Sequence, residues 1–255
     1  NKVVLEYIPK YGQRLADEVR TWGAWIKEEA EKQLAEFYPK DPDGATPIAY
    51  LWARTITCEG PGCGAEVPLM RSLWLAKKGA KSFAVQIVPD PTGKRCDFVI
   101  IKRRNGDWVG QEDESVVYQK PSFEGTVARG SATCPCCGYT TPVASVRAQL
   151  QIRRGGADDA RLWAVATTRP AQPGRSYRVP TEVDIAATRA ARAEIERRTS
   201  AWTGRMSLYP EEMTPRGGGS GAGRAFSQRN YGMERFCDLF TPRQSLALAT
   251  LAERI

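Results

Sequence analysis

The sequence predicts an α+β fold, and three observations lead to this prediction. Two cysteine-containing turns, at residues 58–63 and 134–137, lie far apart in the chain. The segment between them alternates short apolar or β-branched runs with polar and glycine-containing turns, which is typical of an antiparallel meander. Amphipathic helical patterns precede the first turn and follow the second. We therefore expect a β region organised around the cysteine turns, with helices on either side of it in the sequence.

Each cysteine turn has the form of a knuckle, in which two cysteines bracket a tight turn and glycine follows the second cysteine. The turn directs both sulfurs to the same side, and the glycine allows the backbone to fold beneath them. Two facing knuckles supply four thiolates, which is the ligand set of a structural zinc ion. The sequence therefore predicts a zinc ribbon whose ligands are Cys58, Cys63, Cys134 and Cys137.

The spacing of the knuckles requires a long β excursion between them. Seventy residues separate Cys63 from Cys134, whereas a compact ribbon has about 15–20. Such an excursion is tolerated because the entropy of closing a loop grows only logarithmically with its length. Of the other cysteines, we read Cys136 as a spare thiol in preference to a ligand. Cys96 and Cys237 lie in apolar and aromatic runs, so both are expected to be small buried residues.

The N-terminal part predicts one long helix followed by a strand. Residues 12–37 carry apolar side chains every three or four positions, and Pro39 ends the pattern. Residues 41–47 form a turn-rich connector. Residues 48–57 are aromatic and β-branched, and this strand leads directly into the first knuckle. The apolar positions of the helix are Leu15, Val19, Trp22, Ile26, Leu34 and Phe37.

Short strands are expected throughout the excursion. Residues 82–88 and 97–102 predict a hairpin across the turn Asp90–Gly93. Further strands are predicted at 67–75, 116–118 and 126–128.

After the second knuckle the pattern becomes more helical. Residues 143–152 fit a helix or a strand, and residues 161–167 predict a strand. Thr181 begins a helix that extends to about Trp202, with Asp184 in the position of a capping box. We expect the exposed face of this helix to carry Arg189, Arg192, Arg197 and Arg198. These arginines are either a surface that faces phosphate groups or a solvated helix face paired with Glu194 and Glu196.

The C-terminal part predicts a linker and a last helix. Residues 203–230 contain prolines and a glycine run, and they lack the Gly-Lys-Ser/Thr ending of a nucleotide-binding loop, so a flexible linker is the better interpretation. Thr241, Pro242 and Gln244 are suited to the start of a helix. Its apolar face has no following partner, and the first residue is Asn1, so we expect the chain to be a piece of a longer protein.

Composition excludes several classes of chemistry. The chain contains no histidine, which removes the commonest general base and every nucleophile that depends on a histidine.

The net charge is +8, and residues 126–255 carry all of it as an excess of arginine. Arginine binds phosphate groups through its guanidinium fork. A generally arginine-rich proteome is the alternative explanation of this excess. With no long apolar run and no signal-peptide pattern, we expect a cytoplasmic protein without membrane contact.

Four stretches of the sequence carry a resemblance to a known family. Tyr50 to Cys58 and Cys63 to Lys78, together with the second knuckle and the motif Asp238-Leu-Phe-Thr-Pro-Arg-Gln244, resemble the adenine-specific DNA methylases that contain a zinc ribbon. Phe236 and Cys237 stand where the family pattern has Trp-Gly. The resemblance implies an enzyme that uses S-adenosylmethionine to methylate the exocyclic amine of adenine, on a target base turned out of the DNA stack.

The catalytic motifs of that family are not in this sequence. The Asp-Pro-Pro-Tyr/Phe motif and the glycine-rich cofactor loop are missing, so no catalytic residue and no S-adenosylmethionine-binding residue is assigned. The resemblance implies the ribbon-bearing, DNA-contacting or structural region of the methylase, with DNA and the remainder of the methylase chain as partners and structural zinc as the metal. The expected segments are a helix and connector (1–47), the zinc-ribbon β domain (48–170), a basic helical segment (171–202), the linker (203–230) and the last helix (231–255).

Two other functions fit the same sequence. One is a stand-alone zinc-ribbon module that binds nucleic acid. The other is a scaffold that docks protein partners in a DNA-modification or defence assembly through its apolar C-terminal helix.

Overall fold

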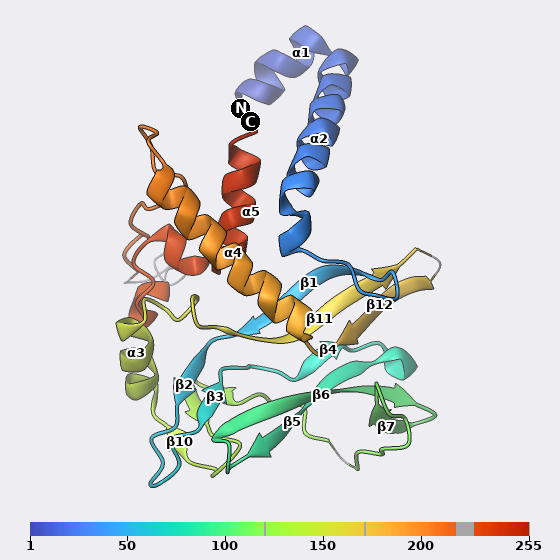
Figure 1. The fold of residues 1–255 in the computed structure, drawn as a ribbon, viewed down its shortest axis with the longest axis vertical. Coiled ribbons are helices and arrows are strands. Elements are labelled where there is room, and N and C mark those ends of the chain that lie inside the picture. The colour runs from blue at the N-terminus through green and yellow to red at the C-terminus, as the bar shows by residue number, and fades with distance from the viewer. Residues whose placement is uncertain (120, 171, 218–226, 255) are drawn as a thin grey trace. The chain divides into compact units, whose positions relative to one another are not determined.

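The structure is a computed structural model that describes residues 1–119, 121–170, 172–217 and 227–254. It has mixed α+β architecture with antiparallel sheets, which confirms the predicted class (Figure 1). The chain forms two compact units that interleave in the sequence. The smaller unit comprises Asn1–Tyr38, Ala187–Tyr209 and Pro242–Ile255, and the larger comprises Pro39–Ala186 and Pro210–Thr241.

The larger unit contains the strands. Within the described residues they form antiparallel sheets with the strand orders β1-β11-β12, β10-β9-β8, β2-β3 and β4-β5-β6-β7. The strands are β1 (Thr46–Ala53), β2 (Thr55–Thr57), β3 (Glu66–Pro68), β4 (Trp74–Ala76), β5 (Phe83–Asp90), β6 (Arg95–Arg104), β7 (Asp107–Gly110), β8 (Val127–Ala128), β9 (Ser131–Thr133), β10 (Thr140–Thr141), β11 (Arg161–Arg169) and β12 (Gln172–Arg178).

The hairpin predicted in the excursion is the pair β5 and β6. Its pairing runs from Phe83 opposite Lys102 to Asp90 opposite Arg95, so both strands are longer than expected. Asp90 explains the turn, because its carboxylate accepts a hydrogen bond from the N–H of Gly93 at 2.8 Å. The strand predicted at 126–128 is observed as the short strand β8. The strand predicted at 116–118 is reduced to an isolated β-bridge between Val117 and Val109.

Two predicted strands are each divided in the structure. The run 48–57 is interrupted at Arg54, so that β1 pairs with β11 while β2 pairs with β3. In the run 67–75, only the two ends form strands, β3 at the start and β4 at the finish. In both cases one apolar run serves two different sheets, and periodicity along the chain does not reveal where the partner strand changes. The first division matters for function because it separates the β2–β3 hairpin from the β1 sheet.

The helices α3 and α4 follow the second knuckle in the sequence. The ambiguous segment 143–152 is a helix, α3 (Val143–Ile152). The predicted capping box is present at the start of α4 (Glu182–Ala201), where the Thr181 N–H donates to the Asp184 carboxylate at 2.8 Å. Short 3-10 helices complete the larger unit: η3 (Gly79–Lys81), η5 (Gln228–Tyr231) and η6 (Phe236–Leu239).

The smaller unit is helical. Its core contains Phe37, Ala191 and Leu246. The predicted helix 12–37 ends earlier and finishes as a 3-10 turn, and only part of its expected apolar face is buried, since Trp22 is 59% exposed. The last helix begins at Pro242 as predicted. The elements of this unit, besides the C-terminal part of α4, are the π-helix η1 (Val3–Tyr7), α1 (Ile8–Tyr11), α2 (Gln13–Leu34), the 3-10 helix η2 (Ala35–Phe37) and α5 (Pro242–Ala252).

The predicted linker 203–230 is packed on both sides of its glycine run, which lies mostly outside the described residues. Thr214 is 1% exposed, and its N–H donates to the Glu234 carbonyl at 2.8 Å. Residues 228–230 belong to η5. At Thr214 and in residues 228–230 the expected flexible linker is therefore held in place by backbone hydrogen bonds. In the described part of the chain, no helix combines the length and the apolar character needed to cross a lipid bilayer.

Candidate metal centre

The first knuckle closes the β2–β3 hairpin. Backbone hydrogen bonds shape it: the Cys58 N–H donates to the Ala65 carbonyl at 2.8 Å, and the Cys63 N–H donates to the Gly60 carbonyl at 3.0 Å. Gly64, directly after the second cysteine, has a φ of +63°, a conformation that favours glycine. The predicted role of this glycine is therefore confirmed.

The second knuckle closes the β9–β10 hairpin in the same manner. The Cys134 N–H donates to the Tyr139 carbonyl at 2.9 Å, and the Gly138 N–H donates to the Cys134 carbonyl at 2.8 Å. Gly138 has a φ of +76°. Two short hairpins thus present two similar turns, although more than seventy residues separate Cys58 from Cys137 in the sequence.

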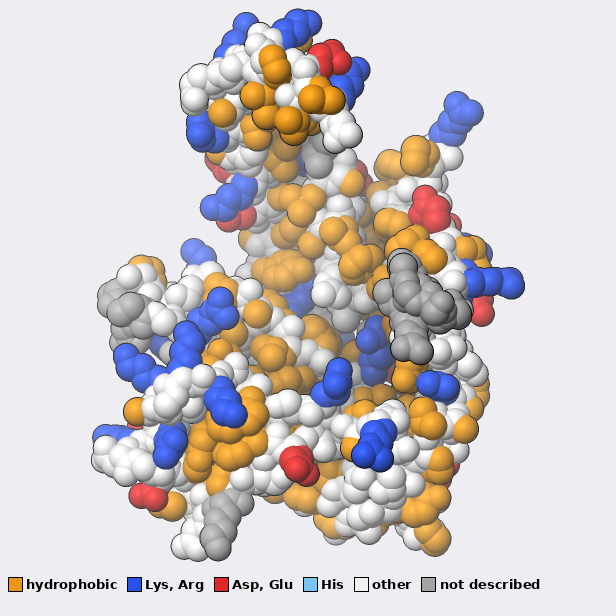
Figure 2. All heavy atoms as spheres, turned by 180° about the vertical axis from the view of Figure 1, so that it is seen from behind, with side chains coloured by type: hydrophobic (Ala, Val, Ile, Leu, Met, Phe, Trp, Pro, Cys, Tyr) orange, Lys and Arg blue, Asp and Glu red, His pale blue; other side chains and the backbone are white. Residues whose placement is uncertain are grey.

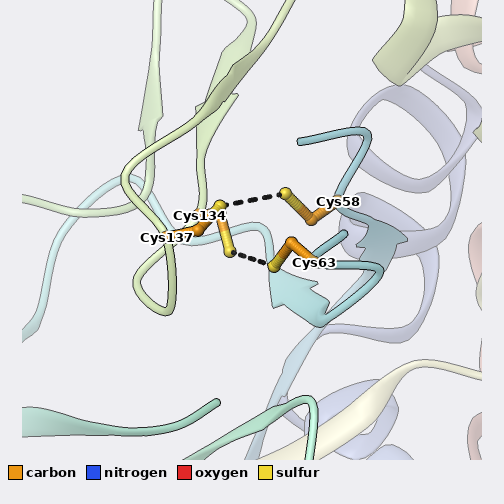
Figure 3. Close-up of side chains that lie close together, drawn as sticks. All are labelled: Cys58, Cys63, Cys134 and Cys137. Carbon is orange, nitrogen blue, oxygen red and sulfur yellow. Dashed lines mark hydrogen bonds between the residues drawn. The ribbon is translucent and has the colours of Figure 1, made fainter. Parts of the chain in front are cut away.

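The four cysteines of the knuckles meet in space (Figure 3). The Sγ atoms of Cys58 and Cys137 lie 3.5 Å apart, and those of Cys63 and Cys134 lie 3.8 Å apart. All four Sγ atoms lie within 4.8 Å of one another. Each hairpin contributes two sulfurs, and each close pair consists of one sulfur from the β2–β3 hairpin and one from the β9–β10 hairpin. The arrangement can hold a metal ion between the two turns.

The site lies partly inside the molecule. Cys58 and Cys134 are buried in an apolar cluster that includes Ile56 and Val67, while Cys137 is exposed. Burial raises the pKa of the Cys58 thiol, since the surroundings disfavour its thiolate. A bound cation reverses this preference, because a thiol that coordinates a metal is deprotonated. Metal binding at this site would therefore release protons.

A glycine that sequence reasoning did not single out allows the two knuckles to approach each other. A Cβ atom at Gly60 would lie 2.8 Å from the Cβ of Tyr139 and 3.1 Å from the Sγ of Cys137. Both distances are shorter than ordinary van der Waals contacts. The sequence offered only the glycine itself as a signal, since Tyr139 belongs to the other knuckle.

Helix α3 supports the first knuckle through Gln149, which sequence reasoning also missed. The Gln149 side chain accepts a hydrogen bond from the Thr57 N–H at 2.8 Å and donates to the Thr57 carbonyl at 3.0 Å. This pair of bonds fixes the backbone next to Cys58. A polar residue on an ambiguous segment carried no signal of such a contact.

The three remaining cysteines lie outside the four-sulfur group. Cys96 is fully buried, as expected, and burial raises the pKa of its thiol to about 12. Its Sγ lies 3.9 Å from the Sγ of Cys136, which also contacts the Arg95 carbonyl at 3.4 Å. Cys136 thus turns away from the metal site toward β6. Cys237 is only half-buried, so the expectation of a buried residue is wrong: its Sγ lies 3.8 Å from the guanidinium of Arg154, whose side chain is exposed.

The arginines expected to form one exposed face of α4 do not share one environment. Arg189 is exposed, and Arg192 is half-buried. Arg197 is exposed and pairs with Glu194 at 2.7 Å. Arg198 is largely buried, where it pairs with Glu194 at 2.7 Å and donates to Thr250 of α5 at 3.0 Å. Arg198 therefore contributes to packing, and its expected exposure is wrong, because the helix turns this side toward α5.

A second buried ionic group lies at the start of α4. The Arg178 guanidinium donates to Asp41 at 2.6 Å and to Asp184 at 2.6 Å. Burial alone would raise the pKa of Asp184, but hydrogen bonds from Arg178 and Thr181 hold that pKa below its usual range. Both carboxylates are largely buried. The group joins the connector before β1 to the end of β12, and the Nε, Nη1 and Nη2 donors of Arg178 all bind oxygen atoms of the protein.

Four thiolates fill a tetrahedral coordination sphere and leave no position for a substrate or an activated water. The geometry therefore suits a structural metal. Searches of protein-family models, curated proteins and solved structures found no match to this chain.

Proposed function

We propose that this chain is the zinc-ribbon region of a DNA adenine methyltransferase, in which structural zinc holds two hairpins together and the region contacts DNA. The observation that carries the proposal is the meeting of four cysteine sulfurs from two separate hairpins. In this proposal the region is not catalytic by itself, and S-adenosylmethionine belongs to the remainder of the methylase chain.

Zinc is the metal favoured by the donor set. Thiolate ligands select zinc, copper(I) and iron–sulfur clusters, and tetrahedral four-thiolate sites are typical of structural zinc. A zinc–sulfur distance of about 2.3 Å gives a sulfur–sulfur edge of about 3.8 Å in a tetrahedron. The two close pairs, at 3.5 and 3.8 Å, are near this edge. All four sulfurs lie within 4.8 Å of one another.

The family resemblance supplies the methyltransferase part of the proposal. The residues that carry it, Tyr50 to Lys78, include β2, the first knuckle and β3, so the resemblance and the proposed metal site concern the same element. The motif from Asp238 to Gln244 leads into α5. The arginine excess after residue 125 supports DNA contact, because cationic side chains neutralise backbone phosphates and release their counterions.

The first test is metal content together with DNA binding. The purified chain is expected to contain one zinc ion per molecule and to bind duplex DNA with an affinity that falls steeply as salt rises. Binding of S-adenosylmethionine to the isolated chain at micromolar affinity, measured by calorimetry, would contradict the assignment of catalysis to the rest of the protein. Absence of DNA binding at about 50 mM salt would remove the DNA-contacting role and leave a structural one.

One observation favours protein docking as a second candidate role, on the N-terminal helices and not on the C-terminal helix that the sequence suggested, since Leu246 and Ala249 of α5 are buried. Apolar side chains of the N-terminal helices are exposed, including Leu5 at 75%, Val19 at 63% and Trp22 at 59%. Such exposure is typical of surfaces that dock other proteins. If this face receives the remainder of the methylase chain, co-expression should yield a complex that Trp22→Glu disrupts while zinc content stays constant. An unchanged complex would exclude this face as the dock.

A further inference from the structure

The larger unit contains a hollow of about 840 Å³ whose charge is one-sided. It lies between the turn that contains η3, strand β6 and strand β12. No carboxylate lies among the residues that the structure describes as its lining. Figure 2 shows several Lys and Arg side chains gathered at the lower left of one face of the molecule. The cationic residues that line the hollow are Lys78, Lys81, Lys102, Arg103 and Arg175.

Most of these cations have no acidic partner. Lys102 forms an ion pair with Glu114. The other four are exposed, and in the described part of the chain none of them forms an ion pair. They differ in this respect from Arg178, Arg197 and Arg198, whose guanidinium groups are already bound to carboxylates. Unpaired cations facing one hollow repel one another, and an anion between them relieves that repulsion.

The backbone that carries two of the cations is fixed by one buried serine. Ser82 is 3% exposed. Its Oγ accepts a hydrogen bond from the Lys78 N–H at 2.9 Å, and its hydroxyl donates to the Gly79 carbonyl at 2.8 Å. Its carbonyl accepts a hydrogen bond from the Arg103 N–H at 3.0 Å. The η3 turn and β6 are thus held together, so the spacing of their cations exists before any ligand binds.

The lining of the hollow also includes an apolar pair. The rings of Phe83 and Tyr177 lie 5.2 Å apart, and the Tyr177 hydroxyl donates to the Leu75 carbonyl at 3.3 Å. Tyr177 belongs to a buried hydrophobic cluster, and Phe83 packs against that cluster. A low-dielectric wall beneath charges of one sign concentrates their field toward solvent. The hollow therefore attracts anions more strongly than the same cations would on a flat, hydrated surface.

We infer that this hollow binds the phosphate backbone of duplex DNA, an inference that rests on the proposed DNA contact and assigns its location. One phosphate would be neutralised by one or two of the cations, whereas four unpaired cations on three chain segments match several successive phosphates. The contact reads no sequence, because the backbone carries no base information. Three of these four cations, Lys78, Lys81 and Arg103, lie in the half of the chain whose total charge is balanced. The fourth is Arg175 of β12, and none lies on α4.

The test compares duplex binding by the intact chain and by a variant without the four unpaired cations. Fluorescence anisotropy with a labelled duplex is measured between about 50 and 200 mM salt. Each phosphate contact contributes about 0.9 to the slope of log affinity against log salt, so four contacts contribute roughly 3.6, or about a 150-fold weakening over this range. We expect the variant's slope to be shallower by about this amount. The substitutions are Lys78→Gln, Lys81→Gln, Arg103→Gln and Arg175→Gln.

Two matched variants keep the test specific. A charge-conserving variant exchanges Lys and Arg at the same four positions and should bind like the intact chain. A second variant removes four exposed cations from the smaller unit and should keep the original slope, although its net charge falls equally. The cations removed in this control are Lys10, Arg14, Arg20 and Lys27. Zinc content and circular dichroism establish that each variant is folded.

The outcomes separate this inference from the proposed function. If the intact chain binds DNA and the four-cation variant binds with an unchanged slope, the hollow is not the contact, while DNA binding stands. If orthophosphate at millimolar concentration, with ionic strength matched, displaces the duplex from the intact chain, the hollow is a small-anion site and the inference is wrong. If the intact chain binds no duplex at low salt, both the inference and the proposed DNA contact fail.

Discussion

Replacing one metal ligand should have a far larger effect than replacing its neighbour. Cys58→Ser removes one of four thiolates from a buried position, whereas Cys136→Ser changes a thiol that turns away from the group. The two substitutions make the same chemical change, sulfur to oxygen. Any difference between them therefore measures membership of the metal site.

The magnitude follows from the coupling of metal binding to folding. Structural zinc supplies roughly 10–16 kcal/mol in small zinc domains, so one ligand of four represents about 3 kcal/mol. For a unit of this size, 1 kcal/mol shifts the melting temperature by about 2–4 °C. Cys58→Ser should therefore lower it by roughly 6–12 °C. Cys136→Ser loses only a weak contact to the Arg95 carbonyl and should cost less than about 1 kcal/mol.

The assay is thermal unfolding by circular dichroism, with and without a chelator. The chelator should destabilise the intact chain and the Cys136→Ser variant, and it should change Cys58→Ser much less. Equal melting temperatures for the two variants would refute the assignment of ligands. A chelator without effect on the intact chain would refute the structural role of a metal.

Three further predictions concern the surroundings of the site and the charged elements. Asp184→Asn leaves Arg178 with one carboxylate and should cost about 3 kcal/mol in urea unfolding at neutral pH. Because the pKa of Asp184 is lowered in the folded state, its stabilisation is present above about pH 4 and is lost as the pH falls further; unfolding at pH 7 and pH 3 should differ less in this variant. Gly60→Ala should cost about 1–3 kcal/mol by forcing the knuckles apart, which the same unfolding measures; a neutral effect would contradict the close approach. Replacing Arg189 and Arg197 with glutamine should leave the salt dependence of DNA binding nearly unchanged, and a flattened slope would place the contact on α4.

The four proposed ligands could be chosen from the sequence because the signal is local. Each knuckle contains its own turn glycine, and the position of glycine after Cys137 distinguishes that residue from Cys136. The hairpin of β5 and β6 is similarly local, since its turn residue Asp90 lies beside its strands. In such elements the pattern that forms the structure is contiguous in the chain.

Long-range pairing could not be predicted in the same way. β1 pairs with β11 across more than one hundred residues, and no feature of either strand specifies the other. β12, with Pro173 and Gly174, lacks a strand pattern, and among the strands that the structure describes it pairs only with β11, at the edge of the sheet. An edge strand tolerates these residues because one side of it needs no partner.

The basic hollow shows why a charge count can mislead. Residues 1–125 carry equal numbers of acidic and basic residues, yet the fold separates them and brings Lys78, Lys81 and Arg103 to one place with Arg175. The arginine excess of the second half pointed to α4, where Arg198 is instead bound to Glu194 and α5. Net charge by segment describes composition, whereas the field at a surface depends on which side chains the fold leaves unpaired.

X-ray absorption at the zinc edge of the purified chain tests the proposed metal site most directly. A site formed by Cys58, Cys63, Cys134 and Cys137 predicts one zinc ion per chain, surrounded by four sulfur atoms at about 2.3 Å. A spectrum dominated by oxygen or nitrogen ligands, a chain without metal, or a disulfide between any two of these cysteines would contradict it.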